Sequence, residues 1–175
     1  MQAGQCKIVW FTGLSGAGKS TLAREIESLL TAQGRRCRIL DGDEMRKSMK
    51  RQEFSRSEIL KNNERVINLC KELKKDFDFL LVAVIAPYIK TREFARKEFC
   101  HNYVEVYVKT TIGTLIDRDT KGLYKKALAG ELKNLIGVDP ASPYEEPQKP
   151  DIIVDTSCES VRESSEKLIK FINQN

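Results

Sequence analysis

The sequence predicts an α/β fold in which helices cover both faces of a five-stranded parallel sheet. Short apolar runs rich in β-branched residues alternate with longer stretches in which apolar residues recur at helical spacing. Strands that are separated by helices pair in parallel, and both faces of such a sheet are buried. The expected strands are residues 7–12, 36–40, 79–86, 103–109 and 151–155. The expected helices are residues 19–33, 56–75, 90–100 and 159–173.

The second expected helix begins within the stretch FSRSEILKNNERV, residues 54–66. Either Ser55 or Ser57 can act as its N-cap, and Glu58 gives Ser55 a capping-box partner. Leu60 interrupts a run of charged residues and is expected to lie in the core.

The connection between the fourth and fifth strands is the longest, at roughly forty residues, and connections of that length in compact domains usually have a function. Its first half reads as helical and is rich in lysine, whereas its second half contains Pro140, Pro143, Pro147 and Pro150 and is expected to be a loop. We therefore expect residues 119–149 to form a mobile lid.

Length and composition indicate one domain, residues 1–175, in a soluble globular protein. Hydrophobic residues make up 41% of the chain and charged residues 31%. No apolar run approaches the ~20 residues that a membrane span requires, so no membrane partner is expected. The N-terminal residues lead into the first strand without the features of a signal peptide, and we expect a cytoplasmic location.

A small phosphate-rich ligand explains the excess of positive charge as well as nucleic acid would. The net charge is +5, and acidic residues lie between the basic ones along the chain. Because no RNA-binding aromatic motif or zinc-finger spacing is present, no nucleic-acid partner is expected. The cysteines are odd in number and lack CxxC spacing, so the sequence suggests neither a disulfide framework nor a zinc site. Most of the five are expected to be buried thiols. The five cysteines are Cys6, Cys37, Cys70, Cys100 and Cys158.

The segment GLSGAGKS, residues 13–20, matches the phosphate-binding loop G-x-x-x-x-G-K-[ST] and lies between a strand and a helix, as that motif requires. Its glycines let backbone N–H groups converge on phosphate, Lys19 reaches the β and γ phosphates, and Ser20 is a ligand for Mg²⁺. This predicts binding of ATP or GTP by a kinase, a GTPase or a motor ATPase. The expected nucleotide-binding residues are Gly13, Leu14, Ser15, Gly16, Ala17, Gly18, Lys19, Ser20 and Thr21.

The second strand ends in LDGDEMR, which places Asp41 and Asp43 at the carboxyl edge of the sheet beside the phosphate-binding loop. We predict that Asp43 accepts a proton from a hydroxyl nucleophile and that Asp41 lies on the metal side with Ser20. The sequence contains no guanine-recognition motif, and the apolar run at residues 79–86 ends without a carboxylate. These observations favour a small kinase.

The motifs GLSGAGKSTLA, LDGDEMR, IAPY and KGLYKKALAGELKNLIGVD followed by PYEEP occur in the order seen in adenylylsulfate kinases, and the chain resembles that family from about Lys7 to Thr156. The resemblance implies a P-loop kinase fold that transfers the ATP γ-phosphate to the ribose 3′-hydroxyl of adenosine 5′-phosphosulfate, forming 3′-phosphoadenosine 5′-phosphosulfate. It implies ATP and Mg²⁺ as cofactors, a small-molecule nucleotide as the partner, and a possible homodimer.

The resemblance also implies the roles of individual residues. Phe54 matches the position that stacks on the acceptor adenine, and Arg46 and Arg65 match positions that hold its anionic groups. Lys121 closes over the reaction centre in the lid and can neutralise developing charge there, which makes it catalytic together with Lys19, Asp41 and Asp43. The ATP set gains Arg118, which packs against adenine, and Thr156. The acceptor set is Asp43, Arg46, Phe54, Asn62, Arg65, Ile85, Lys121, Gly122, Leu123 and Leu135.

Three positions depart from the family pattern. Ala86 replaces the serine of ISPY, which excludes a phosphoserine there and favours direct in-line transfer. Leu135 replaces an aromatic residue of the lid, and Ile59 replaces a substrate-binding arginine on the helix face of Asn62. A lost arginine contact of this kind is worth ~1.5 to 3 kcal/mol, unless Arg56 reaches in instead.

Two alternative functions remain, of which the first is motivated by Ile59 and Leu135. The first is the same chemistry on another 5′-activated nucleotide, such as a cytidine diphosphate derivative of the cytidine diphosphoramidate type, for polysaccharide modification. The second is a non-catalytic nucleotide-binding regulator. The presence of Lys19, Asp43 and Lys121 argues against the second.

Overall fold

The predicted α/β fold is confirmed by the computed structural model, which describes residues 6–47 and 55–174, with the backbone alone at residues 46 and 47. The five strands pair in parallel in the order β2-β3-β1-β4-β5. The third strand ends three residues earlier than expected, because the chain turns away at Ala86, whose φ is 43°. The strands are β1 Lys7–Thr12, β2 Cys37–Asp41, β3 Phe79–Ala83, β4 Tyr103–Lys109 and β5 Ile152–Asp155.

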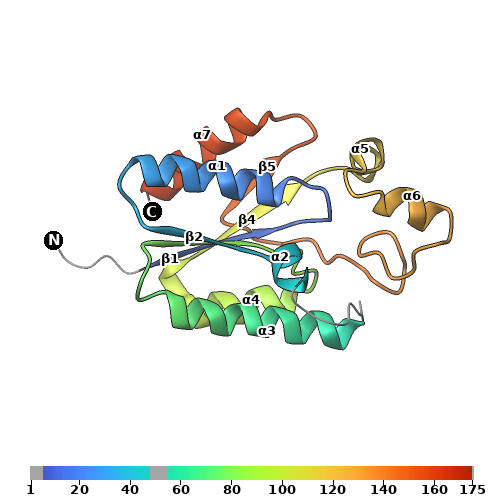
Figure 1. Cartoon of the computed structure of the whole chain (residues 1–175), viewed down its shortest axis with the longest axis horizontal. Coiled ribbons are helices and arrows are strands. Elements are labelled where there is room, and N and C mark those ends of the chain that lie inside the picture. The colour runs from blue at the N-terminus through green and yellow to red at the C-terminus, as the bar shows by residue number, and fades with distance from the viewer. Residues whose placement is uncertain (1–5, 48–54, 175) are drawn as a thin grey trace.

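Helices cover both faces of this sheet, as Figure 1 shows. On one face lie α1, Lys19–Ala32, and α7, Val161–Gln174, and on the other lie α3, Arg56–Leu73, and α4, Ile89–Phe99. Side chains alternate between two apolar clusters along β1: Val9 and Phe11 pack with α1 and α7, while Ile8 and Trp10 pack with α3 and α4. The sheet is therefore buried on both sides. Because its strands pair in parallel, their carboxyl ends lie at one edge.

Short helices lie around that edge. The helical half of the lid is α6, Leu123–Leu128, as expected. Sequence reasoning missed two further helices at this edge, α2, Gly42–Lys47, and α5, Ile112–Arg118. It also missed the 3₁₀ turn η1, Cys100–Asn102, which leads into β4 at the opposite edge. Each is too short for apolar periodicity to reveal it.

The start of α3 confirms the expected N-cap and corrects the position of Leu60. Ser55 Oγ accepts a hydrogen bond of 3.3 Å from the backbone N–H of Glu58. Leu60 is 37% exposed and does not lie in the core. The buried positions of α3 begin only at Asn63, so the first turns of the helix precede the part that covers the sheet.

The expectation that most cysteines are buried is wrong. Cys6 and Cys70 are buried among apolar side chains, and Cys37 is half-buried at the start of β2. Cys100 and Cys158 are exposed, because Cys100 lies in the short turn η1, which buries no residue, and Cys158 lies beyond the end of β5. All five are free thiols. Within residues 6–47 and 55–174, no helix has the length and apolar character needed to cross a membrane.

Candidate active site

The phosphate-binding loop, residues 13–18, connects the end of β1 to the start of α1. Gly13 has a φ of 150°, and a Cβ atom there would lie 2.4 Å from the carbonyl oxygen of Val108 in β4. Gly18 has a φ of 98° and is the residue before the first turn of α1. Glycine is required at both positions, and the loop therefore ends with the N–H groups of a helix N-terminus directed at its interior.

Lys19 lies across this loop. Its side chain is buried, and its Nζ donates to the carbonyl oxygens of Gly13, at 2.8 Å, and Leu14, at 2.7 Å. The ammonium group is thus held over the backbone that would surround a phosphate, which is the position its predicted role needs.

The two carboxylates that follow β2 have different surroundings. Asp41 is buried; one of its carboxylate oxygens accepts a hydrogen bond from Ser20 Oγ, and the other accepts one of 2.8 Å from the backbone N–H of Asp43. Asp43 lies in the first turn of α2, and its side chain is 41% exposed. Asp41 therefore holds Ser20 at the start of α1, while solvent reaches the Asp43 side chain.

Asp43 forms an ion pair with Lys121 of the lid. The two residues are 78 positions apart in the sequence, and the Lys121 side chain is 45% exposed. A carboxylate and a cation thus meet beside the phosphate-binding loop, at a point that solvent still reaches. Lys121 also lines a shallow pocket between the loop and the lid, together with Ser15, Gly16, Leu115, Asp119, Thr120, Leu123 and Tyr124.

The lid also contacts the phosphate-binding loop itself, at Ser15 and at Leu14. The buried Tyr124 hydroxyl donates a hydrogen bond of 2.7 Å to the carbonyl oxygen of Ser15, and burial raises the pKa of this phenol to about 12. At Gly137, where φ is 81°, a Cβ atom would lie 2.4 Å from a methyl carbon of Leu14. Both residues lie within the motif KGLYKKALAGELKNLIGVD, but the sequence did not predict either contact, because each joins segments far apart in the chain.

Asp119 lies between α5 and α6, at the start of the lid. Its carboxylate oxygens accept hydrogen bonds from the backbone N–H groups of Tyr124, at 3.0 Å, and Lys125, at 2.9 Å. The bond from Lys125, followed by that from Tyr124, holds the pKa of the Asp119 carboxyl below its usual value. Gly122, the residue before α6, has a φ of 64° that suits glycine.

Two residues predicted to bind ATP lie together behind the loop. The Arg118 guanidinium donates to the carbonyl oxygen of Thr156 and, at 3.3 Å, to its hydroxyl. The Thr156 hydroxyl donates a hydrogen bond of 3.0 Å to the carbonyl oxygen of Ala17. Arg118 is exposed, so its planar group remains open to stacking.

The predicted acceptor residues come from α3 and from the turn after β3. Asn62 carries a buried side-chain oxygen that has no hydrogen-bond partner among the described residues, and Arg65 is exposed one turn further on. The carbonyl oxygen of Ile85 accepts a hydrogen bond of 2.6 Å from Thr12 Oγ1. Phe54 and the side chain of Arg46 lie outside the described residues. Leu135, Leu123 and Ile59 are half-buried.

Arg56, the first residue of α3, lies against the turn that follows β3. Its guanidinium carbon is 4.9 Å from the ring centroid of the buried Tyr88, a cation–π distance. A cation from the first turn of α3 is therefore placed on the turn that follows β3. Arg56 is the residue that sequence reasoning considered as a substitute for the arginine missing at Ile59.

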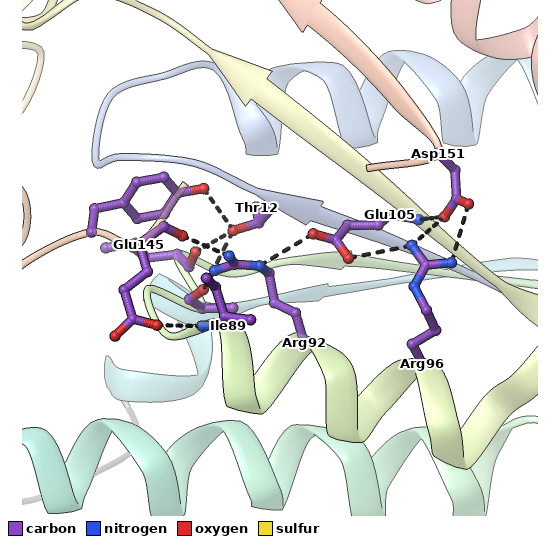
Figure 2. A network of polar contacts seen from close by, with 10 residues as sticks. Thr12, Ile89, Arg92, Arg96, Glu105, Glu145 and Asp151 are labelled. Atoms are coloured by element: carbon purple, nitrogen blue, oxygen red, sulfur yellow. Dashed lines mark hydrogen bonds and ion pairs between the residues drawn. The ribbon is translucent and has the colours of Figure 1, made fainter. Parts of the chain in front are cut away.

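The second half of the lid contains a segment that is fixed to the sheet (Figure 2). The Tyr144 hydroxyl donates to Thr12 Oγ1 at 3.0 Å, and the carbonyl oxygen of Glu145 accepts a hydrogen bond of 2.6 Å from the buried Arg92 of α4. Arg92 also pairs with Glu105 of β4 at 3.2 Å. Burial raises the pKa of the Glu105 carboxyl, and the nearby guanidinium of Arg92 acts in the opposite direction. Sequence reasoning missed Arg92, Glu105 and Glu145.

The site combines a phosphate-binding loop with its lysine, a serine held by a buried carboxylate, and a lid that brings a cation to a second carboxylate. With the five-stranded parallel sheet, these features define a P-loop kinase. The family model for adenylylsulphate kinase matches residues 5–155. The chain belongs to the adenylylsulphate kinase family.

Two related proteins and one solved structure resemble the chain over most of its length. A probable adenylyl-sulfate kinase of Pseudomonas aeruginosa is 43% identical over 164 residues, which are 93% of this chain and 75% of that protein. The adenylyl-sulfate kinase of Halothermothrix orenii is 42% identical over 167 residues, covering 95% of this chain and 89% of that protein. The structure of the Mycobacterium tuberculosis APS kinase in complex with AMPPNP and APS matches with a TM-score of 0.90 at 33% identity, over 97% of this chain and 99% of that one.

Proposed function

We propose that this chain transfers the γ-phosphate of ATP to the ribose 3′-hydroxyl of adenosine 5′-phosphosulfate, forming ADP and 3′-phosphoadenosine 5′-phosphosulfate. The observation that carries the proposal is the ion pair between Asp43 and Lys121. It places a carboxylate that can accept a proton, and a cation that can neutralise phosphate charge, next to the loop that holds the nucleotide. The family of the chain supports the choice of substrate.

Asp43 acts as the base in this reaction. It accepts the proton of the 3′-hydroxyl, whose oxygen forms a bond to the γ-phosphorus while the bond from that phosphorus to the β–γ bridging oxygen breaks. Lys19 and Lys121 neutralise the charge that develops on the phosphate oxygens. Because Ala86 offers no hydroxyl, the phosphoryl group passes directly to the acceptor.

Ser20 and Asp41 are the residues that would hold Mg²⁺. Their hydroxyl and carboxylate oxygens are of the kind that Mg²⁺ prefers, and they are in contact with each other. The described residues contain no cluster of three or more His, Cys, Asp or Glu side chains suited to a metal. This fits an ion that takes one or two protein ligands and the phosphates of its nucleotide, whose negative charge it would reduce.

The acceptor lies between α3 and the turn after β3. The unpartnered side-chain oxygen of Asn62 can accept a hydrogen bond from it, and Arg65 and Arg56 supply positive charge for its sulfate and phosphate groups. Arg56 compensates for Ile59, which stands where the family has an arginine. Arg46, Phe54, Ile85, Gly122, Leu123 and Leu135 complete the acceptor site, and Arg118 and Thr156 complete the ATP site.

The product makes this a step of sulfate activation, which we place in the cytoplasm. We expect the enzyme to act as a homodimer. Light scattering of the purified protein at working concentration measures the mass of the particle and contradicts this expectation if it finds the monomer alone.

The test of the function is an assay of ADP formation with adenosine 5′-phosphosulfate beside a panel of cytidine and uridine nucleotides that includes cytidine diphosphate derivatives. We expect efficient turnover of the adenylyl compound, with phosphorus NMR locating the new phosphate on the 3′-oxygen. Turnover of a cytidine compound alone would show that the acceptor is wrong. Tight ATP binding without transfer to any acceptor would indicate a regulator.

A further inference from the structure

Arg92 is a buried arginine whose guanidinium joins two backbone segments on either side of it. The residue is 2% exposed. One terminal nitrogen donates a hydrogen bond of 2.6 Å to the carbonyl oxygen of Ala86, and the other donates one of 2.6 Å to that of Glu145. Nε lies 3.2 Å from a carboxylate oxygen of Glu105, which balances the charge (Figure 2).

The first of these segments is the acceptor turn, residues 85–88. Ala86 has a φ of 43°, in the left-handed region that residues other than glycine rarely adopt. Such a conformation persists only where the surrounding structure imposes it, and residues of this kind concentrate at functional sites. The hydrogen bond from Arg92 to the Ala86 carbonyl is one of the contacts that impose it.

The second segment is the lid anchor, residues 144–145. The backbone N–H of Glu145 donates a hydrogen bond of 2.8 Å to the carbonyl oxygen of Pro87, and its side chain accepts one of 2.7 Å from the N–H of Ile89. Tyr144 bonds to Thr12, which in turn bonds to Ile85. The acceptor turn, the lid anchor and the last residue before the phosphate-binding loop thus form one connected unit.

A buried arginine is a costly way to join two segments if joining them is its only purpose. The desolvation of a buried ion pair commonly offsets its electrostatic gain, and apolar residues of similar volume are often as stabilising. What the guanidinium adds is geometry, since its planar set of donors fixes the direction and spacing of each group that it binds.

We propose that Arg92 is a positioning residue for phosphoryl transfer, which sets the acceptor turn and the lid anchor relative to each other and so places the acceptor against the phosphate-binding loop. The inference rests on the proposed function, because it assigns the acceptor to that turn. It predicts that Arg92 affects the acceptor step and leaves ATP binding unchanged.

Arg96 provides a matched control. It lies one turn further along α4 and belongs to the same charged network, with Asp151 at 2.7 Å and Glu105 at 3.4 Å (Figure 2). Among the described residues its side chain contacts these carboxylates and the ring of Tyr103, at 5.0 Å, and neither segment that Arg92 joins. If the network serves stability alone, equivalent substitutions of the two arginines should act alike.

The experiment compares Arg92→Lys with Arg96→Lys, each of which keeps the positive charge. We expect Arg92→Lys to lower kcat/KM for the acceptor about tenfold or more, because small misplacements of a reacting group are amplified in rate, while the KM for ATP stays within about twofold. Arg96→Lys should leave both values within about twofold. Equal effects of the two variants, or an Arg92→Lys variant with altered stability and unaltered acceptor kinetics, would overturn the proposal.

Hydrogen exchange of the free protein gives a readout that needs no substrate. The amides of Ile89 and Glu145 should exchange faster in Arg92→Lys and at the wild-type rate in Arg96→Lys. If these amides respond as expected but the wild type does not phosphorylate adenosine 5′-phosphosulfate, the proposed function fails and not the coupling of the segments. An active wild type with unaltered amides and acceptor kinetics in Arg92→Lys refutes the positioning role.

A second variant keeps the proposal testable if Arg92→Lys does not fold. Glu145→Ala removes the carboxylate that binds the Ile89 amide and leaves Arg92 in place. It should raise the acceptor KM and accelerate exchange at Ile89. An unaltered acceptor KM in this variant would contradict the inference.

Discussion

Lys121 in the lid forms an ion pair with Asp43 in the first turn of α2, and the side chains are 45% and 41% exposed. An ion pair so open to solvent contributes little to stability. Its importance lies in the chemistry, because it leaves a carboxylate and a cation within reach of the phosphate-binding loop and of an incoming ligand.

Asp43→Asn should abolish most of the turnover while sparing ATP binding. Loss of a general base typically costs 10²- to 10⁴-fold, roughly, and we expect kcat to fall within that range. The dissociation constant of ATP, measured by calorimetry, should stay within about twofold, because Lys19 and the loop are unaltered. A kcat near that of the wild type would show that Asp43 is not the base.

Lys121→Met should also lower kcat, and the double variant should lose less than the product of the two single losses because the residues interact. Lys126→Met is the control, since this neighbouring lysine lies on the exposed side of α6. An equal loss in the control would mean that the general charge of the lid matters, and not the partner of Asp43.

Gly137→Ala and Gly130→Ala separate backbone strain from contact with the phosphate-binding loop. Both glycines have positive φ, 81° and 75°, but a Cβ atom at Gly137 meets Leu14 while one at Gly130 meets nothing within 4 Å. Each variant should lose about 1 to 2 kcal/mol of unfolding free energy from strain. Only Gly137→Ala should raise the KM for ATP, since Leu14 must move. Equal ATP kinetics in both would contradict the proposed contact.

The hydrogen bonds that the Asp119 carboxylate accepts at the start of the lid should depend on pH in the acid range. Backbone donors hold the pKa of the Asp119 carboxyl below 3.8. A group whose pKa is depressed by folding stabilises the fold above its unfolded pKa, and this stabilisation disappears as the pH falls through the folded value. The amide proton shifts of Tyr124 and Lys125 should therefore titrate with a midpoint below 3.8, and Asp119→Asn should abolish the transition. A midpoint at or above that value contradicts the assignment.

The cysteines should react in two groups. Burial raises the pKa of the Cys70 thiol to about 12 and that of Cys6 to about 11, so both remain protonated near neutral pH. Cys100 and Cys158 are exposed and should be the first to react with an aromatic disulfide reagent. Cys6 and Cys70 should react only in urea. Rapid reaction of Cys70 in the native protein would contradict its burial, and Cys100→Ser should remove one rapid equivalent.

The sequence predicted the strands and the nucleotide side of the site because both leave local patterns. Apolar runs identify strands, and the phosphate-binding motif specifies spacing residue by residue. The prediction that Leu60 lies in the core was wrong, because the local sequence could not indicate that α3 begins to cover the sheet only at Asn63. A sequence pattern indicates which side of a helix is apolar, but it does not indicate how far along the helix the sheet extends.

The Arg92 network left no such pattern. Its guanidinium donates to the carbonyl oxygen of Ala86, which is 6 positions away, and to that of Glu145, which is 53 positions away. Because every residue type has a backbone carbonyl, the sequence does not identify these partners. An arginine in a charged helical segment reads as part of a solvated face. Only the three-dimensional structure reveals that Arg92 is buried and that its guanidinium is hydrogen-bonded to backbone carbonyl oxygens.

The close approach of Gly13 to β4 has a consequence for how nucleotide is captured. Because a Cβ atom at Gly13 would lie 2.4 Å from the Val108 carbonyl oxygen, the backbone of the loop rests directly against the sheet. The loop is thus shaped by the strand beneath it before any phosphate arrives. Nucleotide meets a preorganised cradle, and its affinity is not reduced by the entropy of ordering a flexible one.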